Sequence, residues 1–218
     1  MGENKAPAEL LRRGLFFPIA GVNKLTGENW CQDHLTNEKL WQLLAKIDND
    51  FAEEARGKGC LHPDCGGRLH RSDYERKPRG GPGWGRRDSF CCDEDGCRRR
   101  ETPMSVRFLG RRVYAGFVVV LVSAMVHGLK PERVQRIREV LAIDRRTLER
   151  WREWWSTTLV KSSFWKAARA RFMPPLCEPT LPWSLGRRFE IERPERLLDL
   201  LKFLAPLTRP VSGKSQGI

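Results

Sequence analysis

The sequence lacks any apolar run long enough to cross a bilayer. Its longest one, VYAGFVVVLVSAMV at 113–126, falls short of the about 20 residues that a transmembrane helix needs, so we interpret it as a buried element. The first residues, MGENKAPAELLRRG, contain no apolar segment behind a basic start, so we find no secretory signal. We therefore expect a cytoplasmic protein without a membrane partner, whose thiols stay reduced.

Acidic residues are scarce relative to basic ones. The chain of 218 residues has 27 Asp and Glu against 40 Lys and Arg, which gives a formal net charge of +13 and a pI near 9.9. The excess begins near residue 60, because residues 1–59 carry nearly equal numbers of acids and bases. A basic balance predicts a polyanionic partner, most commonly nucleic acid.

Recognisable catalytic motifs are also missing. There is no Gly-x4-Gly-Lys-Ser/Thr loop for phosphates, no His-x-His motif, and only two tyrosines, Tyr74 and Tyr114. Most acids lie beside Lys or Arg, as on solvated helix faces, and do not form the converging carboxylates of a metal-dependent strand-transfer site. We expect no enzymatic activity.

Four of the seven cysteines form two pairs with the same spacing. GCLHPDCGGRLH at 59–70 contains Cys60 and Cys65, and SFCCDEDGCRRR at 89–100 contains Cys92 and Cys97. Two such pairs joined by a hairpin-sized segment predict a four-thiolate site for a structural Zn²⁺, as in zinc ribbons. The metal would stabilise a Gly- and Arg-rich region that cannot build much of a hydrophobic core.

Alternatives remain open at this site. Cys91 competes with Cys92, and His62 or His70 could replace a thiolate. The usual spacing within a pair is two intervening residues, not four. Unrelated reduced cysteines, a redox role and an iron–sulfur role also remain open.

The region around the cysteines predicts a β-hairpin. Residues 67–77 and 85–90 read as strands, and PRGGPGWG between them reads as a turn or loop. We expect Gly66, Gly67 and Gly96 to supply the backbone freedom that the two cysteine loops require.

A helix is predicted before the cysteines. Apolar residues recur at helical spacing in this stretch: Leu40, Leu44, Ile47 and Phe51. Thr36 or Asn37 can cap its start and Gly57 can end it. We see only a packing role for this helix.

The stretch KPERVQRIREVLAIDRRTLERWREWW at 130–155 predicts a helix, a tight turn and a second helix. Asp144 can cap the second helix, and Leu148, Trp151 and Trp155 form its inward stripe. In a helix–turn–helix protein the start of the second helix enters the major groove of duplex DNA. The candidate contacts there are Arg145, Arg146, Thr147 and Arg150.

A second set of arginines follows Cys97. A dense basic run gives affinity without sequence information, so we interpret these side chains as phosphate contacts. They are Arg98, Arg99, Arg100, Arg107, Arg111 and Arg112.

The predicted fold is mainly α with a small β zinc ribbon, followed by a helix–turn–helix bundle. We divide the chain into a helical segment at 1–59, a zinc ribbon at 60–112, a helix–turn–helix at 113–161 and a helical segment with a frayed tail at 162–218. In the last segment, PWSLGRRFE and RPERLLDLLKFLAPL are the helix candidates.

The cysteine pairs and the motif AIDRRTLERW together resemble the zinc-ribbon DNA-binding proteins of bacterial insertion sequences. The likeness covers about residues 60–160. It implies a sequence-specific DNA-binding regulator or transposition accessory protein, associated with the bacterial nucleoid, which would work beside a recombinase or transposase encoded nearby. The other hypothesis is a non-catalytic subunit that binds RNA or protein through its basic surface. Self-association into a homodimer stays open.

Overall fold

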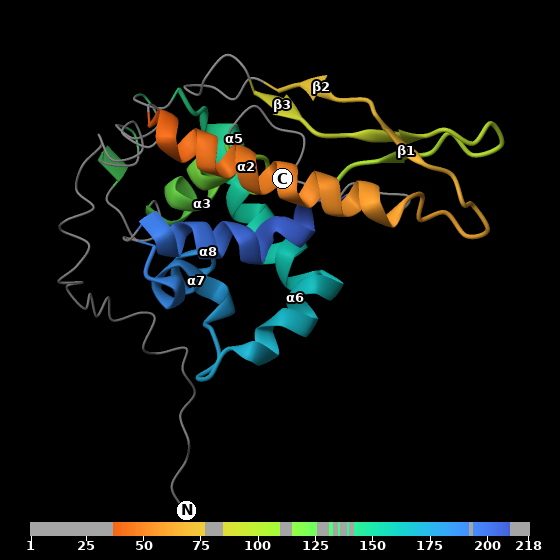
Figure 1. Cartoon of the computed structure of the whole chain (residues 1–218). Helices are drawn as coiled ribbons and strands as arrows, with labels where there is room; N and C mark the ends of the chain where they lie inside the picture. Colours follow the sequence, from red (N-terminus) through yellow and green to blue (C-terminus); the bar gives the residue numbers. More distant parts are fainter. Residues whose placement is uncertain are drawn as a thin grey trace, which may run out of the picture.

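The computed structural model describes residues 37–76, 85–109, 115–125, 142–191 and 194–209, together with Pro131, Glu132, Gln135 and Glu139. Figure 1 shows a body of packed helices from which a narrow β-ribbon projects. The helices are α2 (Glu38–Lys58), α3 (Gly116–Met125), α5 (Arg145–Glu153), α6 (Ser163–Ala168), α7 (Trp183–Phe189) and α8 (Pro194–Leu204). A mainly helical fold with a small antiparallel sheet confirms the coarse prediction.

Helix α2 begins and ends through local caps. The side-chain oxygen of Asn37 accepts a hydrogen bond from the backbone N–H of Leu40 at 3.0 Å, which selects Asn37 over Thr36 as the N-cap. The helix runs past the predicted stop at Gly57 and ends at Gly59, whose φ of +68° favours glycine.

The buried stripe of α2 is shifted from the predicted one. Its fully buried positions are Trp41, Leu44, Asp48 and Ala52, whereas the predicted Leu40, Ile47 and Phe51 are only half-buried. The periodicity was therefore correct, but the stripe is centred one residue further along the chain. The reason is tertiary, because this face contacts both the helical body and the β-ribbon.

The β-ribbon consists of two antiparallel sheets that follow one another along one hairpin. β1 (Leu69–Arg71) and β5 (Arg100–Glu101) flank β4 (Phe90–Cys92), and β2 (Tyr74–Glu75) pairs with β3 (Arg86–Arg87). Both predicted strand regions are confirmed, each split in two. We call residues 60–101 the cysteine hairpin.

Helix α3 lies at the centre of the body. Every residue from Phe117 to Val122 is at most 1% exposed, and the helix contacts α5, α7 and α8. A helix that is apolar all round must be covered on every side, and α3 is covered, although its β-branched triplet Val118–Val120 locally suits a strand. The length of the apolar run predicts a helix that ends at Gly128, and that residue lies outside the described part of the chain.

Helix α5 begins where the sequence predicts. The Asp144 carboxylate accepts from the backbone N–H of Thr147 at 2.7 Å, and Ala142 in the turn has φ +50°. Leu148, Trp151 and Trp155 are buried as expected. The helix continues as a π-helix, η2 (Trp154–Leu159). Of the predicted preceding helix, the structure describes only Pro131, Glu132, Gln135 and Glu139, all of which are helical.

The C-terminal helix candidates are both confirmed as α7 and α8. Helix α8 buries Leu197, Leu200, Leu201 and Leu204 against the body. The predicted frayed tail is TRPVSGKSQGI at 208–218, but its first two residues are held by side-chain contacts. The Thr208 hydroxyl accepts from the backbone N–H of Ser105 at 2.8 Å, and Arg209 pairs with Glu101 at 2.7 Å. Residues 210–218 lie outside the described part.

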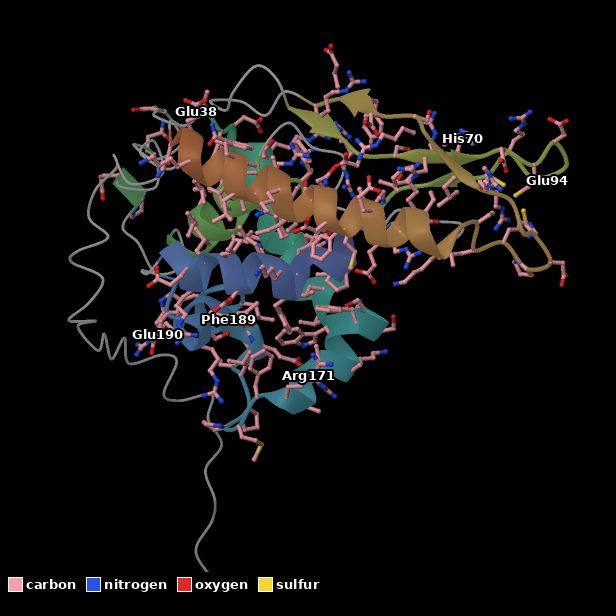
Figure 2. The ribbon with its side chains drawn as sticks, viewed as in Figure 1. Glu38, His70, Glu94, Arg171, Phe189 and Glu190 are labelled. Atoms are coloured by element: carbon pink, nitrogen blue, oxygen red, sulfur yellow. The ribbon has the colours of Figure 1, made fainter. Side chains whose placement is uncertain are left out.

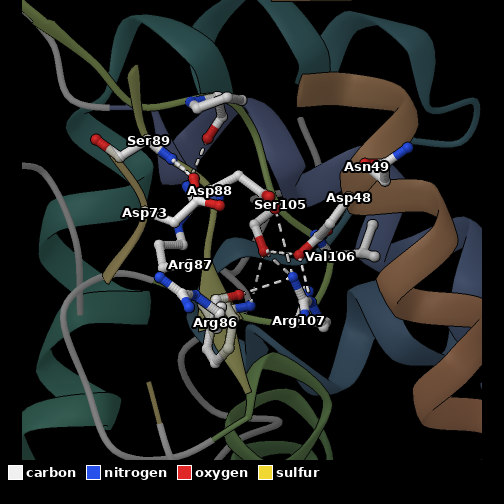
Figure 3. A network of polar contacts seen from close by, with 12 residues as sticks. Asp48, Asn49, Asp73, Arg86, Arg87, Asp88, Ser89, Ser105, Val106 and Arg107 are labelled. Carbon is white, nitrogen blue, oxygen red and sulfur yellow. Dashed lines mark hydrogen bonds and ion pairs between the residues drawn. The ribbon is translucent and has the colours of Figure 1, made fainter. Parts of the chain in front are cut away.

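A buried polar network joins the cysteine hairpin to the body (Figure 3). The fully buried Asp48 carboxylate accepts from the Ser105 hydroxyl at 2.6 Å, the Val106 backbone N–H at 2.7 Å and Arg107 Nε at 2.7 Å. Arg107 also donates to Asp88 Oδ2 at 3.4 Å and to the Arg86 carbonyl at 2.9 Å. This network fixes the chain at the exit of the hairpin.

Within the described ranges, no helix combines the length and the apolar character that crossing a membrane requires.

Candidate metal centre and basic surfaces

The four predicted cysteines come together at the end of the hairpin remote from β2 and β3. The sulfur atoms of Cys60, Cys65, Cys92 and Cys97 all lie within 4.8 Å of one another. The shortest separations are 3.7 Å from Cys60 to Cys97 and 3.6 Å from Cys65 to Cys92. Each close contact therefore joins one cysteine of the first pair to one of the second, and the thiols are not joined by disulfides.

These distances fit a metal ion. Four sulfur ligands about 2.3 Å from a tetrahedral Zn²⁺ would lie about 3.8 Å apart, close to the two shortest separations. The cluster is half-buried and packs on Ala52, Leu69 and Phe90. The four cysteines can hold a metal ion.

The two cysteine loops have the same backbone hydrogen bonds. The backbone N–H of the first cysteine donates to the carbonyl seven residues later, from Cys60 to Gly67 and from Cys92 to Arg99. The N–H of the second cysteine donates to the carbonyl three residues earlier, from Cys65 to His62 and from Cys97 to Glu94. The equal sequence spacing therefore corresponds to two equivalent loops.

Strand geometry decides between Cys91 and Cys92. Successive side chains of a strand point to opposite faces, and cross-strand partners share a face. Cys92 pairs with the buried Leu69, whereas Cys91 pairs with the exposed His70. Only Cys92 belongs to the sulfur cluster.

The two alternative histidine ligands also lie outside the cluster. His70 Nε2 lies 3.2 Å from an oxygen of Asp93, and His62 Nδ1 lies 2.7 Å from the carbonyl oxygen of Pro63. Neither histidine belongs to the group of clustered ligand atoms, and the candidate ligand set consists of four thiols.

The role predicted for the loop glycines needs correction. The left-handed positions in the loops are Asp64, with φ +60°, and Arg98, with φ +45°, and not the glycines. A Cβ atom on Gly67 would lie 2.4 Å from Cys92 Sγ, whereas one on Gly66 or Gly96 would meet nothing within 4 Å. Gly67 is thus required because it lies against a ligand atom, and not for its backbone freedom.

The thiols differ in acidity. The backbone N–H of Glu94 lowers the pKa of Cys92, but burial and the three neighbouring thiols outweigh it and raise that pKa to about 12. The backbone N–H of Arg99 instead holds the pKa of Cys97 below its ordinary value. A bound cation would let four thiolates coexist at these distances, because opposite charge favours the ionised form.

Asp93 links the two loops directly behind the cluster. Its Oδ1 accepts from the backbone N–H of Arg68 at 2.7 Å, and its own N–H donates to the Arg68 carbonyl at 3.0 Å. The residue after Cys92 is therefore tied to the chain that leaves the first loop, which fixes the separation of the two cysteine pairs.

The start of α5 exposes three of the four predicted DNA contacts. Arg145, Arg146 and Arg150 are exposed, and Arg145 Nε donates to Glu149 at 2.7 Å across one helical turn. Thr147 differs from the prediction, because it is 4% exposed. Its hydroxyl donates to Asp144 Oδ2 at 2.9 Å and accepts from Arg150 at 2.7 Å, so it serves the helix cap.

The arginines that follow Cys97 divide into two groups. Arg98, Arg99 and Arg100 are exposed, although Arg98 pairs with Asp95 and Arg100 donates to Ser72 at 3.2 Å. Arg107 was predicted to contact phosphate, but it is 5% exposed and bonded to Asp48. The predicted contacts Arg111 and Arg112 lie outside the described residues.

Asp48 is the main residue that the sequence did not reveal. It occupies a position of the apolar stripe of α2, four residues after Leu44 and four before Ala52. An acid within such a stripe is the one available signal, because an acid at a core position needs a buried partner. The partner, Arg107, is 59 residues away in sequence.

No family model, characterised protein or solved structure matches this chain.

Proposed function

We propose that the four cysteines bind a structural Zn²⁺. Sulfur-only ligands and sulfur separations close to a tetrahedron support zinc over the harder cations, which prefer oxygen ligands. The metal would hold together a hairpin whose own apolar cluster is small.

Neighbouring cysteines provide a matched test of this zinc site. Cys92→Ser should lose the metal and Cys91→Ser should keep one zinc per chain, although the two residues are adjacent. Elemental analysis of protein purified without chelator measures both. Wild-type protein without zinc, or equal zinc contents in the two variants, would contradict the proposal.

We further propose that the protein binds duplex DNA in a sequence-specific manner, with α5 as the reading helix. The observation that carries this proposal is the rigid presentation of Arg145 and Arg146 at the exposed start of α5. The cap at Asp144 fixes the end of the helix, and the fully buried Trp151 fixes its rotation. Arginine at such a helix start can bind guanine through two parallel hydrogen bonds.

The narrower role, as regulator or accessory protein of a mobile element acting with a recombinase, rests on the resemblance of the cysteine pairs and the α5 sequence. The net charge of +13 supports binding to a polyanion in general, including RNA.

Arg146→Ala is the sharpest test of the reading helix, because the structure gives its side chain no ion-pair partner among the described residues. A site selected from a random duplex library serves as the cognate. The variant should lose roughly 1–3 kcal/mol of binding free energy on that site and much less on unrelated duplex.

Arg196→Ala on α8 is the matched control, since it removes one exposed arginine from another surface. Equal losses on cognate and unrelated duplex for Arg146→Ala would show that α5 supplies charge only. Binding to single-stranded RNA without duplex binding would favour the alternative of a subunit in a nucleoprotein complex.

A further inference from the structure

The C-terminal half of the body carries basic residues with few acids beside them. Between Lys161 and Ile191 the sequence has six Lys or Arg residues and only two acids, Glu178 and Glu190. All six basic side chains are exposed. They are Lys161, Lys166, Arg169, Arg171, Arg187 and Arg188.

Four of these residues come from neighbouring elements around the end of α6. Lys166 lies on α6, and Arg169 and Arg171 lie on η3 (Arg169–Arg171), which follows it directly. Arg188 of α7 donates to the carbonyl of Met173, and Phe172 packs against Phe189 with ring centroids 6.3 Å apart. We call Lys166, Arg169, Arg171 and Arg188 the C-terminal basic surface.

Little of this charge is neutralised within the described part of the chain. Glu178 accepts from Arg169 at 3.1 Å and from the Trp165 indole N–H at 2.8 Å, so its carboxylate is already used. Lys166 and Arg171 form no ion pair among the described residues. The partial negative charge at the C-terminal end of α6 can stabilise one basic side chain in its last turn, but not all four basic side chains of this surface.

The surface is remote from both the cysteine cluster and the start of α5. Figure 2 shows Arg171 well separated from His70 and Glu94, which mark the cysteine hairpin. An unbroken helical segment, α5 followed by η2, runs from Arg145 to Lys161, immediately before the Ser162 cap of α6. At about 1.5 Å per residue this segment is about 24 Å long, so the two basic regions lie at opposite ends of one helical rod.

We propose that the C-terminal basic surface contacts the phosphate backbone of duplex DNA, as a second contact region beyond α5. The proposal rests on the proposed DNA-binding function. All four side chains are exposed, Arg169 is the one with an ion pair among the described residues, and the large apolar side chain exposed beside them is Met173. A surface so rich in charge fits a polyanion better than a protein interface, whose centre is depleted in charge. Such contacts add affinity without adding sequence preference.

The test is the salt dependence of binding to a duplex of roughly 30 base pairs, long enough to reach beyond one end of the rod. Each phosphate contact contributes about −0.9 to the slope of log affinity against log salt. Lys166→Gln/Arg171→Gln should therefore make the slope shallower by roughly 1.8, by equal amounts on cognate and unrelated duplex.

Lys39→Gln/Lys46→Gln on α2 is the matched control, because it removes two exposed charges from a helix whose acids and bases nearly balance. Its slope should equal that of the wild type. Melting curves should show that both double variants fold, since none of the four side chains has a contact that either substitution would break within the described residues.

Two outcomes would overturn the proposal and can be told apart. If the wild-type slope is steep and Lys166→Gln/Arg171→Gln leaves it unchanged, the C-terminal basic surface does not contact DNA and α5 remains the binding element. If the wild-type protein shows no salt-dependent binding to duplex DNA, both the proposed function and the proposed role of this surface are contradicted. If the double variant is unstable, each of the two single variants should make the slope shallower by about 0.9.

Discussion

At the cysteine cluster, the importance of a glycine depends on how much room a side chain would have at its position. Gly67 lies so close to Cys92 that any side chain would meet the ligand sulfur at 2.4 Å and the Asp93 carboxylate at 3.1 Å. Gly66, the adjacent residue, has open space at the same position. Two neighbouring glycines therefore have different structural importance.

We expect Gly67→Ala to weaken metal binding by displacing Cys92, whereas Gly66→Ala should leave it unchanged. Competition with a zinc-binding dye, which measures the dissociation constant of the metal, distinguishes them. A lower affinity for Gly67→Ala of at least tenfold is the expected range, by analogy with losses from disturbed supporting residues of metal sites, about 10–100-fold. Similar affinities for both variants would contradict this account of Gly67.

Asp48 is a second residue whose importance comes from its surroundings. Its carboxylate is fully buried and accepts three hydrogen bonds, one of them from the guanidinium of Arg107. A buried charge without its partner is strongly unfavourable, because the protein interior solvates it poorly.

Asp48→Asn should lower the free energy of unfolding by about 3–5 kcal/mol, since it removes the nearer and fully buried of the two carboxylates that pair with Arg107. Asp50→Asn on the exposed side of the same helix should change it by less than about 0.5 kcal/mol. Urea denaturation measures both. If Asp48→Asn changes the free energy of unfolding only slightly, Asp88 alone is sufficient to compensate the charge of Arg107.

At the scale of secondary-structure elements, α5 combines an exposed basic start with a buried aromatic side. Asp144 accepts from both the backbone N–H and the hydroxyl of Thr147, and these bonds lower the pKa of its carboxyl. A carboxyl whose folded-state pKa is depressed stabilises the protein above its unfolded pKa, and the stabilisation is lost as pH falls through the folded value.

We therefore expect the stability difference between wild type and Asp144→Ala to be full above about pH 5, since the unfolded pKa of Asp is about 3.9. This difference in stability should shrink as the pH falls below about 5. Melting temperatures at a series of pH values measure it. Asp144→Asn, which keeps a capping oxygen without the charge, should retain most of the stability but lose this pH dependence. A difference that does not vary with pH would contradict the charged cap.

At the scale of the whole molecule, the protein has two apolar clusters of unequal size. The large one joins α2, α3, α5, α7 and α8, and the small one consists of Ala52, Leu69, Phe90 and Cys92 beside the other cluster cysteines. Helix α2 contributes to both. We therefore expect the cysteine hairpin to depend on the proposed metal ion and on the Asp48 network more than on its own core.

Removal of the metal by a chelator should therefore unfold the cysteine hairpin while the helical body persists. Hydrogen exchange should lose protection at β1, β4 and β5 and retain it in α3 and α8. Adding zinc back should restore the protection. Simultaneous loss of protection in α3 would show that the hairpin and the body unfold as one unit.

The sequence by itself determined the features that depend on nearby residues. The N-cap at Asp144 follows from a side chain that reaches an N–H three residues away, the cap of α2 was narrowed to Thr36 or Asn37 by the same rule, and the helix positions follow from apolar spacing. The cysteine cluster was predictable because each pair is local and equally spaced, but the choice between Cys91 and Cys92 and the possible roles of His62 and His70 stayed open until the structure placed them.

Only the tertiary structure decided which polar groups are buried. Arg107 and Thr147 are residue types that often contact nucleic acid at a protein surface. In the folded chain, Arg107 instead donates to the buried Asp48, and the buried Thr147 hydroxyl donates to Asp144 in the N-cap of α5. Gly67 faces a sulfur atom from the other cysteine loop. The physical reason is that burial and close approach depend on residues brought together from distant parts of the chain, and local spacing carries no information about those partners.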